Sequence, residues 1–311
     1  MSLFEKWLYA LKINSWPKLL VPFFLGQGIG FTHSAQGSFV IFFMGFLFTV
    51  FLLGYIVLLN DYADINVDTI KRKLFPNDCS PKTIPDQILD SKTVLWGGLL
   101  MGLLSILMAF ILQFYTGKDF IVLFSFLCVI VFAAYSLPPI RLNYRGGGEF
   151  LEMMGVGLML PLFHFYLQAG ISIDLMLVFI LIMSTLYAFS SALASGLSDE
   201  ESDRIGGKNT FVTFFGNQRT RTIIDFIILF NYVYLLGFCI FFKTVFPFYT
   251  DFVLILYSLY HIYFILKFSG NARTNEFQFQ KMYKDHIHKL IWGFVSLFTF
   301  LLNLEYFFKM Y

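Results

Sequence analysis

The sequence predicts an all-α protein, a polytopic bundle of nine transmembrane helices that forms a single domain over residues 1–311. Two observations lead to this prediction. First, 58% of the residues are hydrophobic and only 14% are charged, whereas a soluble domain usually carries about a quarter charged residues. Second, the chain contains repeated runs without Asp, Glu, Lys or Arg, several of which reach the roughly 20 residues that a helix needs to cross a bilayer.

The charge-free runs give the spans in chain order. The first run, Leu19–Asn60, is long enough for two helices if the small and polar segment Thr32–Gly37 forms the turn between them. Lysines flank the last two runs, which are short, and their aliphatic stems can reach the interface and lengthen the effective span. The remaining seven spans are Thr93–Gly117, Phe120–Ile140, Met153–Ile173, Leu175–Ser198, Phe226–Phe242, Phe252–Leu266 and Leu290–Leu304.

The placement of Lys and Arg predicts the orientation. Most of them lie in the N-terminal segment and in the loops after spans two, four, six and eight, so we expect this side, with the N-terminus, to face the cytoplasm. The amphipathic N-terminal segment is interrupted by Glu5, Lys6 and Lys12 and is expected at the membrane interface rather than as a cleaved signal. Short loops and the lack of a transit peptide favour a prokaryotic inner (plasma) membrane.

Charge and cysteine content exclude several classes of function. The formal net charge is only +2, without the basic excess that nucleic-acid binding requires. The three cysteines, Cys79, Cys128 and Cys239, show no C-x-x-C spacing, which argues against a disulfide framework or a zinc site. No feature of the sequence implies a protein partner.

Ten of the twenty acidic residues lie in two loops on the expected cytoplasmic side, residues 61–91 and 199–221. If the second span continues as a helix, Asp61, Asp64 and Asp68 share one of its faces, and Asp199 and Asp203 are spaced in the same way after the sixth span. Carboxylates gathered in this way repel one another unless a cation lies between them. Mg²⁺ prefers such oxygen ligands and commonly bridges them to a diphosphate.

Basic residues directly follow both clusters: Lys71 and Arg72 after the first, Arg204 and Lys208 after the second. Their side chains are suited to phosphate oxygens that a metal leaves free. A simpler interpretation is that both loops are solvated and charged as loops usually are, and a salt-bridge network that closes the surface also remains open. Two acid clusters with basic followers on one membrane face favour the metal–diphosphate site.

Four segments resemble motifs of the UbiA superfamily of intramembrane prenyltransferases. Residues 60–68, NDYADINVD, resemble its N-D-x-x-D-x-x-x-D motif, and residues 199–210, DEESDRIGGKNT, resemble its D-x-x-x-D segment followed by G-K-x-T. Residues 135–142, YSLPPIRL, and 146–149, GGGE, are similar to the Y-S-x-P-P-x-R-L and G-x-G-E segments found after the fourth helix. With the nine predicted helices, the resemblance covers essentially the whole chain.

The resemblance implies a membrane enzyme with its active site on cytoplasmic-side loops, which transfers a prenyl group from a polyprenyl diphosphate to an acceptor that is usually aromatic. It implies Mg²⁺ as the cofactor and the lipid bilayer as the surroundings. By this analogy the first Mg²⁺ is held by Asn60, Asp61, Asp64 and Asp68, and the second by Asp199 and Asp203.

The chain departs from the family pattern in two places. Many members have Arg-Pro where this chain has Ser80-Pro81, so Lys82 becomes the candidate for the missing diphosphate contact. Some members carry Y-x-x-x-K, whereas Pro139 stands four residues after Tyr135, and Arg141 becomes the candidate substitute.

Two further residues are candidates for catalysis. Tyr135 lies at the end of a predicted span on the side of the acid clusters. Glu149 is similarly placed and is able to orient an acceptor hydroxyl or accept a proton, although a carboxylate at a helix start also complements the helix dipole.

The expected acceptor is a quinone precursor, because the G-x-G-E and G-K-x-T segments look more like the menaquinone branch, with 1,4-dihydroxy-2-naphthoate, than the ubiquinone branch, with 4-hydroxybenzoate. Homogentisate, porphyrin and lipid acceptors also occur in the superfamily. A rival from another class is a cation-coupled secondary transporter, although transporters place ionisable groups near the bilayer midplane. A family member that binds isoprenoid without catalysis is a third alternative, which the intact aspartates oppose.

Overall fold

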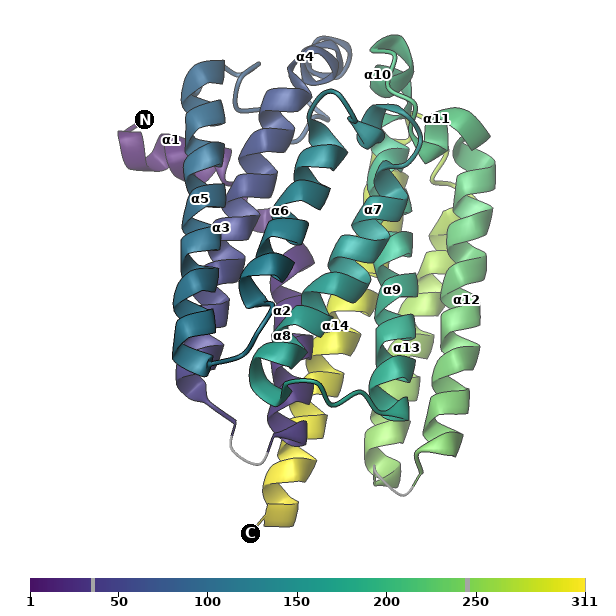
Figure 1. The fold of residues 1–311 in the computed structure, drawn as a ribbon. Helices are drawn as coiled ribbons and strands as arrows, with labels where there is room; N and C mark the ends of the chain where they lie inside the picture. The colour runs from purple at the N-terminus through teal and green to yellow at the C-terminus, as the bar shows by residue number, and fades with distance from the viewer. Residues whose placement is uncertain (35–36, 244–246, 311) are drawn as a thin grey trace.

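The computed structural model describes residues 1–34, 37–243 and 247–310. Over these ranges the elements are helices, joined by loops and by one isolated parallel bridge between Arg145 and Asn209. Long helices run side by side to form one bundle (Figure 1). They are α2 (Pro17–His33), α3 (Phe39–Ala63), α5 (Ser91–Thr116), α6 (Ile121–Ser136), α7 (Gly148–Met154) with η3 (Gly155–Met159) and α8 (Leu160–Ala169), α9 (Leu175–Gly196), α12 (Asn217–Phe241), α13 (Phe248–Ser269) and α14 (Phe277–Met310).

Seven helical segments of the described chain are long and apolar enough to cross a membrane. The predicted number of nine is therefore not confirmed: α6, with 16 residues, is apolar but shorter, and α2 has 17. The last two helices are longer than predicted, because charged residues such as Lys284 and Lys289 lie within α14 rather than outside it. The turn expected at Thr32–Gly37 includes residues 35–36, which lie outside the described residues.

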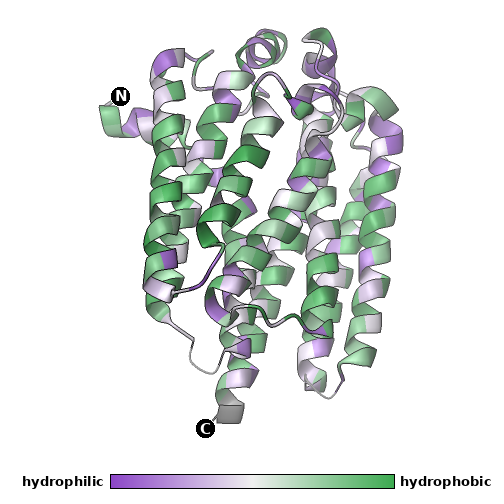
Figure 2. Ribbon diagram, in the orientation of Figure 1, coloured by the Kyte–Doolittle hydropathy of each residue, from purple (hydrophilic) through white to green (hydrophobic). Residues whose placement is uncertain are grey.

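One end of the bundle carries three short helices. Here lie α4 (Ile65–Leu74), α10 (Glu200–Ile205) and α11 (Phe211–Phe215), and hydrophilic residues gather at this polar end (Figure 2). The N-terminal helix α1 (Leu3–Ala10) lies across the bundle near the same end and exposes Leu3 and Phe4. This placement agrees with the amphipathic interfacial segment expected from the sequence.

The prediction of one continuous helix through the first acid cluster is wrong. Helix α3 ends at Ala63, Asp64 leaves the helical conformation with φ −97° and ψ 12°, and α4 starts at Ile65. The guanidinium of Arg141 donates a hydrogen bond to the carbonyl oxygen of Ala63, and the hydroxyl of Tyr144 donates a longer one of 3.4 Å to the same oxygen. The loop after α6 therefore satisfies a backbone group at the break.

A buried polar network joins α2, α3 and α8 in the apolar part of the bundle. His164 contacts the side chains of Gln27 at 3.2 Å and Thr49 at 2.9 Å, and Gln168 donates to Gln27 at 2.7 Å. Gly26 permits the close packing of these helices, since a Cβ there would lie 2.2 Å from the carbonyl oxygen of Pro161. The network fixes the register of α2 against α8.

Candidate functional site

A cavity of about 490 Å³ opens at the polar end of the bundle. Its walls come from α2, α3, α4, α6, α7, α9, α10 and α14, and from the loop at residues 80–82. The structure therefore brings together two acid clusters that are far apart in the sequence. The predicted metal ligands that line the cavity are Asn60, Asp61, Asp64, Asp68, Asp199 and Asp203.

Several of these carboxylates are deeply buried. Asp61 is 3% exposed, Asp64 and Asp68 are 6% exposed, and Asp203 is 3% exposed. A buried carboxylate is costly unless a cation or hydrogen-bond donors compensate its charge. The arrangement of these residues therefore depends on what neutralises them.

The two motifs neutralise each other through exchanged ion pairs. Lys71, which follows the first cluster, pairs with Asp199 of the second. Lys208, which follows the second cluster, donates to Asp64 of the first at 2.9 Å. Because each lysine crosses to the opposite motif, the two segments are tied to one site.

Two further ion pairs complete the first cluster. Lys82 pairs with Asp68, and Lys12 pairs with Asp61, which also accepts a hydrogen bond from Thr83. Burial raises the pKa of Asp68 above its usual range despite the charge of Lys82. Lysine ammonium groups thus hold the carboxylates of the first cluster.

The loop that carries Lys82 is fixed by Arg72, which the structure places outside the cavity. Its guanidinium donates two hydrogen bonds of 2.7 Å to Asp86, and further bonds to the carbonyl oxygens of Pro76 and Ser80. Burial acts to raise the pKa of Asp86, but the hydrogen bonds from Tyr9 and Arg72 hold this pKa below its usual range. Arg72 thus orders the loop in which Ser80, Pro81 and Lys82 line the cavity.

The other two predicted arginines also lie outside the cavity. The guanidinium carbon of Arg141 is 3.4 Å from the ring centroid of Tyr144, where the side chain serves the helix break. Arg204 pairs with Glu200 at 3.0 Å and its side chain is 62% exposed. Among the predicted diphosphate contacts, the cavity is lined by Lys71, Lys82 and Lys208.

Both predicted catalytic residues line the cavity. Tyr135 lies in the last turn of α6. Glu149 is buried in the first turn of α7 and accepts a 2.7 Å hydrogen bond from the backbone N–H of Phe211. This bond ties α7 to the start of α11, directly after the segment that carries Lys208.

Two lysines of the cavity, Lys82 and Lys208, keep their charge despite burial. Burial acts to lower the pKa of Lys82, but Asp68 and Asp199 more than offset it, and the pKa lies above its usual range. For Lys208 the charges of Asp64 and Asp203 have the same effect against burial. The cavity therefore holds fixed positive charges beside the carboxylates.

The donor set fits a hard divalent cation. Carboxylate and carboxamide oxygens converge on one cavity, and such oxygens are the ligands that Mg²⁺ prefers. Oxygen Oδ1 of Asp64 is buried and has no hydrogen-bond partner within the described ranges. In that part of the chain no three His, Cys, Asp or Glu side chains meet closely enough to hold a metal as they stand, since lysines are paired with Asp61, Asp64, Asp68 and Asp199.

The structure adds residues that the sequence patterns did not indicate. Lys12, Lys18 and Lys284 line the cavity, as does Glu152, which pairs with Lys18 at 2.6 Å. Lys18 stands at a predicted span boundary and Lys284 in a predicted loop. The spacing of the motifs gave no signal for them, because none of the four belongs to a motif.

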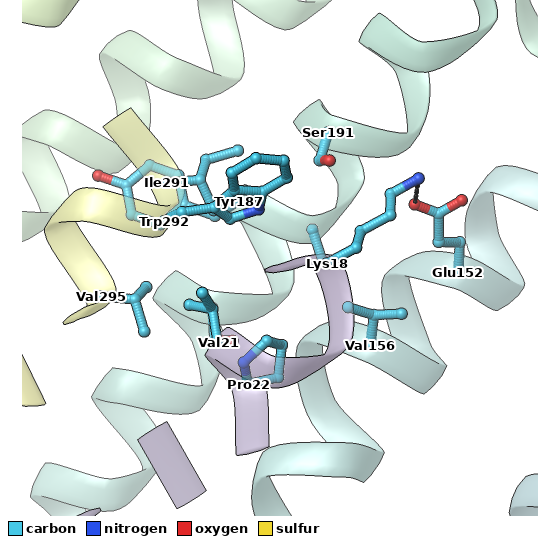
Figure 3. Close-up of a pocket in the computed structure, with 12 residues that line it drawn as sticks. Lys18, Val21, Pro22, Glu152, Val156, Tyr187, Ser191, Ile291, Trp292 and Val295 are labelled. Atoms are coloured by element: carbon cyan, nitrogen blue, oxygen red, sulfur yellow. Dashed lines mark ion pairs between the residues drawn. The ribbon is translucent and has the colours of Figure 1, made fainter. Parts of the chain in front are cut away.

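A smaller pocket adjoins the cavity and shares Lys18, Glu152 and Val156 with it. The ion pair of Lys18 and Glu152 lies at one side, and aromatic and aliphatic side chains, including Tyr187 and Trp292, lie at the other (Figure 3). The polar cavity therefore borders an apolar wall formed by α2, α9 and α14.

The three cysteines, Cys79, Cys128 and Cys239, are free thiols in the structure.

Comparisons with solved structures agree with this architecture. A UbiA homologue from Archaeoglobus fulgidus bound to DMAPP and Mg²⁺ is 15% identical, with a TM-score of 0.68 over 92% of this chain and 99% of that chain. A UbiA homologue from Archaeoglobus fulgidus bound to GPP and Mg²⁺ is also 15% identical, with a TM-score of 0.66 over 94% of this chain and 99% of that chain. A structure of digeranylgeranylglyceryl phosphate synthase is 12% identical, with a TM-score of 0.62 over 98% and 99%. At these identities the likeness shows the fold.

A search of curated proteins finds no match. The family model for the UbiA prenyltransferase family, in contrast, matches residues 19–284, which include both acid clusters and the segments between them. The resemblance noted in the sequence is thereby confirmed. The chain therefore belongs to the UbiA prenyltransferase family and is an integral membrane prenyltransferase.

Proposed function

We propose that this protein transfers a prenyl group from a polyprenyl diphosphate to an aromatic quinone precursor, with 1,4-dihydroxy-2-naphthoate as the first candidate. The observation that carries the proposal is the exchange of ion pairs between the motifs, Lys71 with Asp199 and Lys208 with Asp64, around one cavity. A diphosphate in this cavity meets both acid clusters and both lysines at once.

The cofactor in this proposal is Mg²⁺. Bound in the cavity, it would neutralise the diphosphate and stabilise the negative charge that develops when the allylic C–O bond breaks. The unpartnered oxygen of Asp64 and the oxygen-rich donor set support it. The residues that would hold it are Asn60, Asp61, Asp64 and Asp68 in the first cluster and Asp199 and Asp203 in the second.

The lysines provide the remaining electrostatic stabilisation. Lys71, Lys82 and Lys208 line the cavity next to the carboxylates, and we assign them to the oxygens of the diphosphate. The three arginines act one step away: Arg72 holds the loop of Lys82, Arg141 holds the helix break, and the exposed Arg204 pairs with Glu200. The sequence predicted direct contacts to the diphosphate from six basic residues, whereas this proposal assigns direct contacts to the three lysines alone.

Tyr135 and Glu149 face the carbocation and the acceptor in this proposal. The ring of Tyr135 is placed to shield the allylic cation. Glu149 is placed to accept the proton that leaves the acceptor ring, while its second task is to hold α11 through Phe211. The short helices α4, α10 and α11 at the polar end limit the access of water, which would otherwise convert the cation to a prenyl alcohol.

The donor is supported by the A. fulgidus structures, which are bound to DMAPP and GPP with Mg²⁺. The acceptor is less constrained, because digeranylgeranylglyceryl phosphate synthase shares the fold. 4-Hydroxybenzoate is the alternative aromatic acceptor. We further propose that the polar end and the N-terminus face the cytoplasm of a prokaryotic inner membrane, in accord with the Lys and Arg placement.

One assay tests the proposal. Purified protein with Mg²⁺ is offered a panel of polyprenyl diphosphates together with 1,4-dihydroxy-2-naphthoate and 4-hydroxybenzoate in competition, and the products are identified by mass spectrometry. The expected result is a prenylated naphthoate and released diphosphate. Release of diphosphate with neither aromatic product would refute the aromatic acceptor, and no release from any donor would refute the proposal as a whole.

A further inference from the structure

Six lysines line the cavity, and five of them have an ion-pair partner. The exception, within the described part of the chain, is Lys284 on α14, for which no carboxylate lies within ion-pair distance and no acceptor within hydrogen-bond distance. The paired lysines are Lys12, Lys18, Lys71, Lys82 and Lys208.

Charged groups lie near Lys284, but within the described residues none of them forms an ion pair with its ammonium group. The charged groups that act on it are two lysines and two carboxylates: Lys18, Lys71, Asp199 and Glu152. Glu152 is already paired with Lys18, and Asp199 with Lys71. An ammonium group that is partly buried beside two other lysines is unfavourable unless an anion joins it.

Lys284 belongs to a helix that carries neither motif. This helix, α14, packs against α2, α9 and α13. Lys71, Lys82 and Lys208, by contrast, each contact an aspartate of the motifs. Positive charge in the cavity thus comes both from the lysines that pair with the acid clusters and from Lys284 on α14.

Helix α14, which carries Lys284, also lines the apolar pocket of Figure 3 through Ile291, Trp292 and Val295. Lys284, His288 and Trp292 are four residues apart along α14 and therefore share one face. The rings of His288 and Trp292 stack with centroids 4.4 Å apart, and His288 contacts the hydroxyl of Ser191 at 3.1 Å. A free ammonium thus stands at the start of an aromatic surface.

We infer that Lys284 binds the anionic group of the acceptor and selects for acceptors that carry one, either the carboxylate of an aromatic acid or the phosphate of a glyceryl phosphate lipid. This inference rests on the proposed function. The diphosphate occupies the wall of the acid clusters, and the acceptor anion occupies the wall of α14. The separation keeps the two negatively charged substrates on different lysines, and the aromatic surface favours a flat acid.

The test measures equilibrium binding and turnover with Lys284→Gln, which removes the charge while it keeps most of the side chain. The probes are 1,4-dihydroxy-2-naphthoate, its neutral carboxamide, and a glyceryl phosphate ether lipid. The expected result concerns the two anionic probes, the naphthoate and the lipid. The wild type is expected to bind one of these two acids about tenfold more tightly than Lys284→Gln does, a difference of about 1.4 kcal/mol. Binding of the neutral carboxamide stays unchanged.

Two variants serve as controls. Lys281→Gln removes an exposed lysine one turn earlier on the same helix and is expected to bind both acids like the wild type. Lys284→Arg keeps the charge and is expected to recover most of the affinity. The affinity for a non-hydrolysable prenyl thiodiphosphate in the presence of Mg²⁺ is expected to be the same in all four proteins.

Weaker binding of only one of the two anionic probes by Lys284→Gln supports the inference. A weaker naphthoate complex identifies the anion as a carboxylate, and a weaker lipid complex identifies it as a phosphate. Equal binding of the naphthoate and its carboxamide by the wild type, together with equal binding of the glyceryl phosphate lipid by the wild type and by Lys284→Gln, overturns the inference. Weaker binding of the thiodiphosphate in Lys284→Gln with the acids unaffected also overturns it. Failure of the proposed function is seen separately, as a wild type that releases no diphosphate from any prenyl donor, whatever its binding of acids.

Discussion

Among the buried polar clusters between the described helices, two differ in kind, and only one of these two has the properties of a reaction site. The network of Gln27, Thr49, His164 and Gln168 sits in the apolar part of the bundle, where neutral groups contact one another at 2.7 to 3.2 Å. The cluster at the polar end consists of charged pairs around a cavity of about 490 Å³.

The difference lies in what each cluster leaves unsatisfied. Thr49 donates to the carbonyl oxygen of Gly45 and contacts His164, so its hydroxyl is satisfied on both sides. At the polar end, Oδ1 of Asp64 has no partner and Lys284 has no counter-ion in the described chain. Buried polarity alone therefore indicates packing, whereas unpaired charge beside a cavity indicates a ligand.

The largest effect is expected from Asp199→Asn. This change removes a charge from the second acid cluster at a side chain that is 36% exposed. We expect turnover to fall roughly a thousandfold, the equivalent of about 4 kcal/mol of transition-state stabilisation, with little change in thermal stability. The control is Asp78→Asn, at an exposed acid of the first loop. Full activity in Asp199→Asn would contradict the role of the second cluster.

Mg²⁺ is expected to stabilise one cluster and not the other. Saturation at about 100 times the dissociation constant adds roughly 2.7 kcal/mol to the folded state, so the melting temperature should rise with added Mg²⁺ in the wild type and in His164→Gln. The rise should disappear in Asp64→Asn, and EDTA should remove turnover reversibly. An equal rise in Asp64→Asn would place the metal elsewhere.

The intramembrane network is expected to matter for stability alone. His164→Leu leaves the buried side chains of Gln27 and Thr49 without their partner, which should cost about 1–3 kcal/mol. Turnover of the protein that remains folded should stay within about twofold of the wild type. Denaturation in detergent and a rate per folded molecule measure the two quantities. If the turnover of His164→Leu were as low as that of Asp199→Asn, the intramembrane network would also be needed for the reaction, which would contradict this prediction.

The smallest effect concerns the loop held by Arg72. Because the pKa of Asp86 is lowered in the folded protein, its ionised form contributes stability that is present above the pKa of about 3.9 in the unfolded chain and is lost as the pH falls through the folded value. The melting temperature of the wild type should therefore fall more steeply between about pH 5 and pH 3 than that of Asp86→Asn. The contribution should not exceed about 1 kcal/mol. Parallel curves for the two proteins would show that the contact is without effect.

The sequence was sufficient for the fold class and for the acid clusters, because both depend on local patterns. Charge-free runs mark helices directly, and Asp64 and Asp199 stand in motifs with fixed spacing. The break of the helix at Asp64 was not predictable in this way, since it depends on Arg141 and Tyr144 from a distant loop.

The same limit applies to the basic residues. Arg72 and Lys71 are neighbours in the sequence, yet one turns to Asp86 and the other into the cavity. Lys284 carries no motif at all and reaches the cavity only through the packing of α14 against α2 and α9. Which base faces the site is decided by long-range contacts, and no local pattern records them.

The central claim is that both acid clusters bind one diphosphate in one cavity. It is tested most directly by the affinity of a non-hydrolysable prenyl thiodiphosphate, with Mg²⁺ present, for Asp64→Asn, Asp199→Asn and the protein with both changes. We predict that each single substitution abolishes most of the binding. The double variant should bind the thiodiphosphate no more weakly than the single variant with the lower affinity, because the residues act as a unit. Losses that multiply in the double variant, or a single variant that binds like the wild type, would contradict the claim.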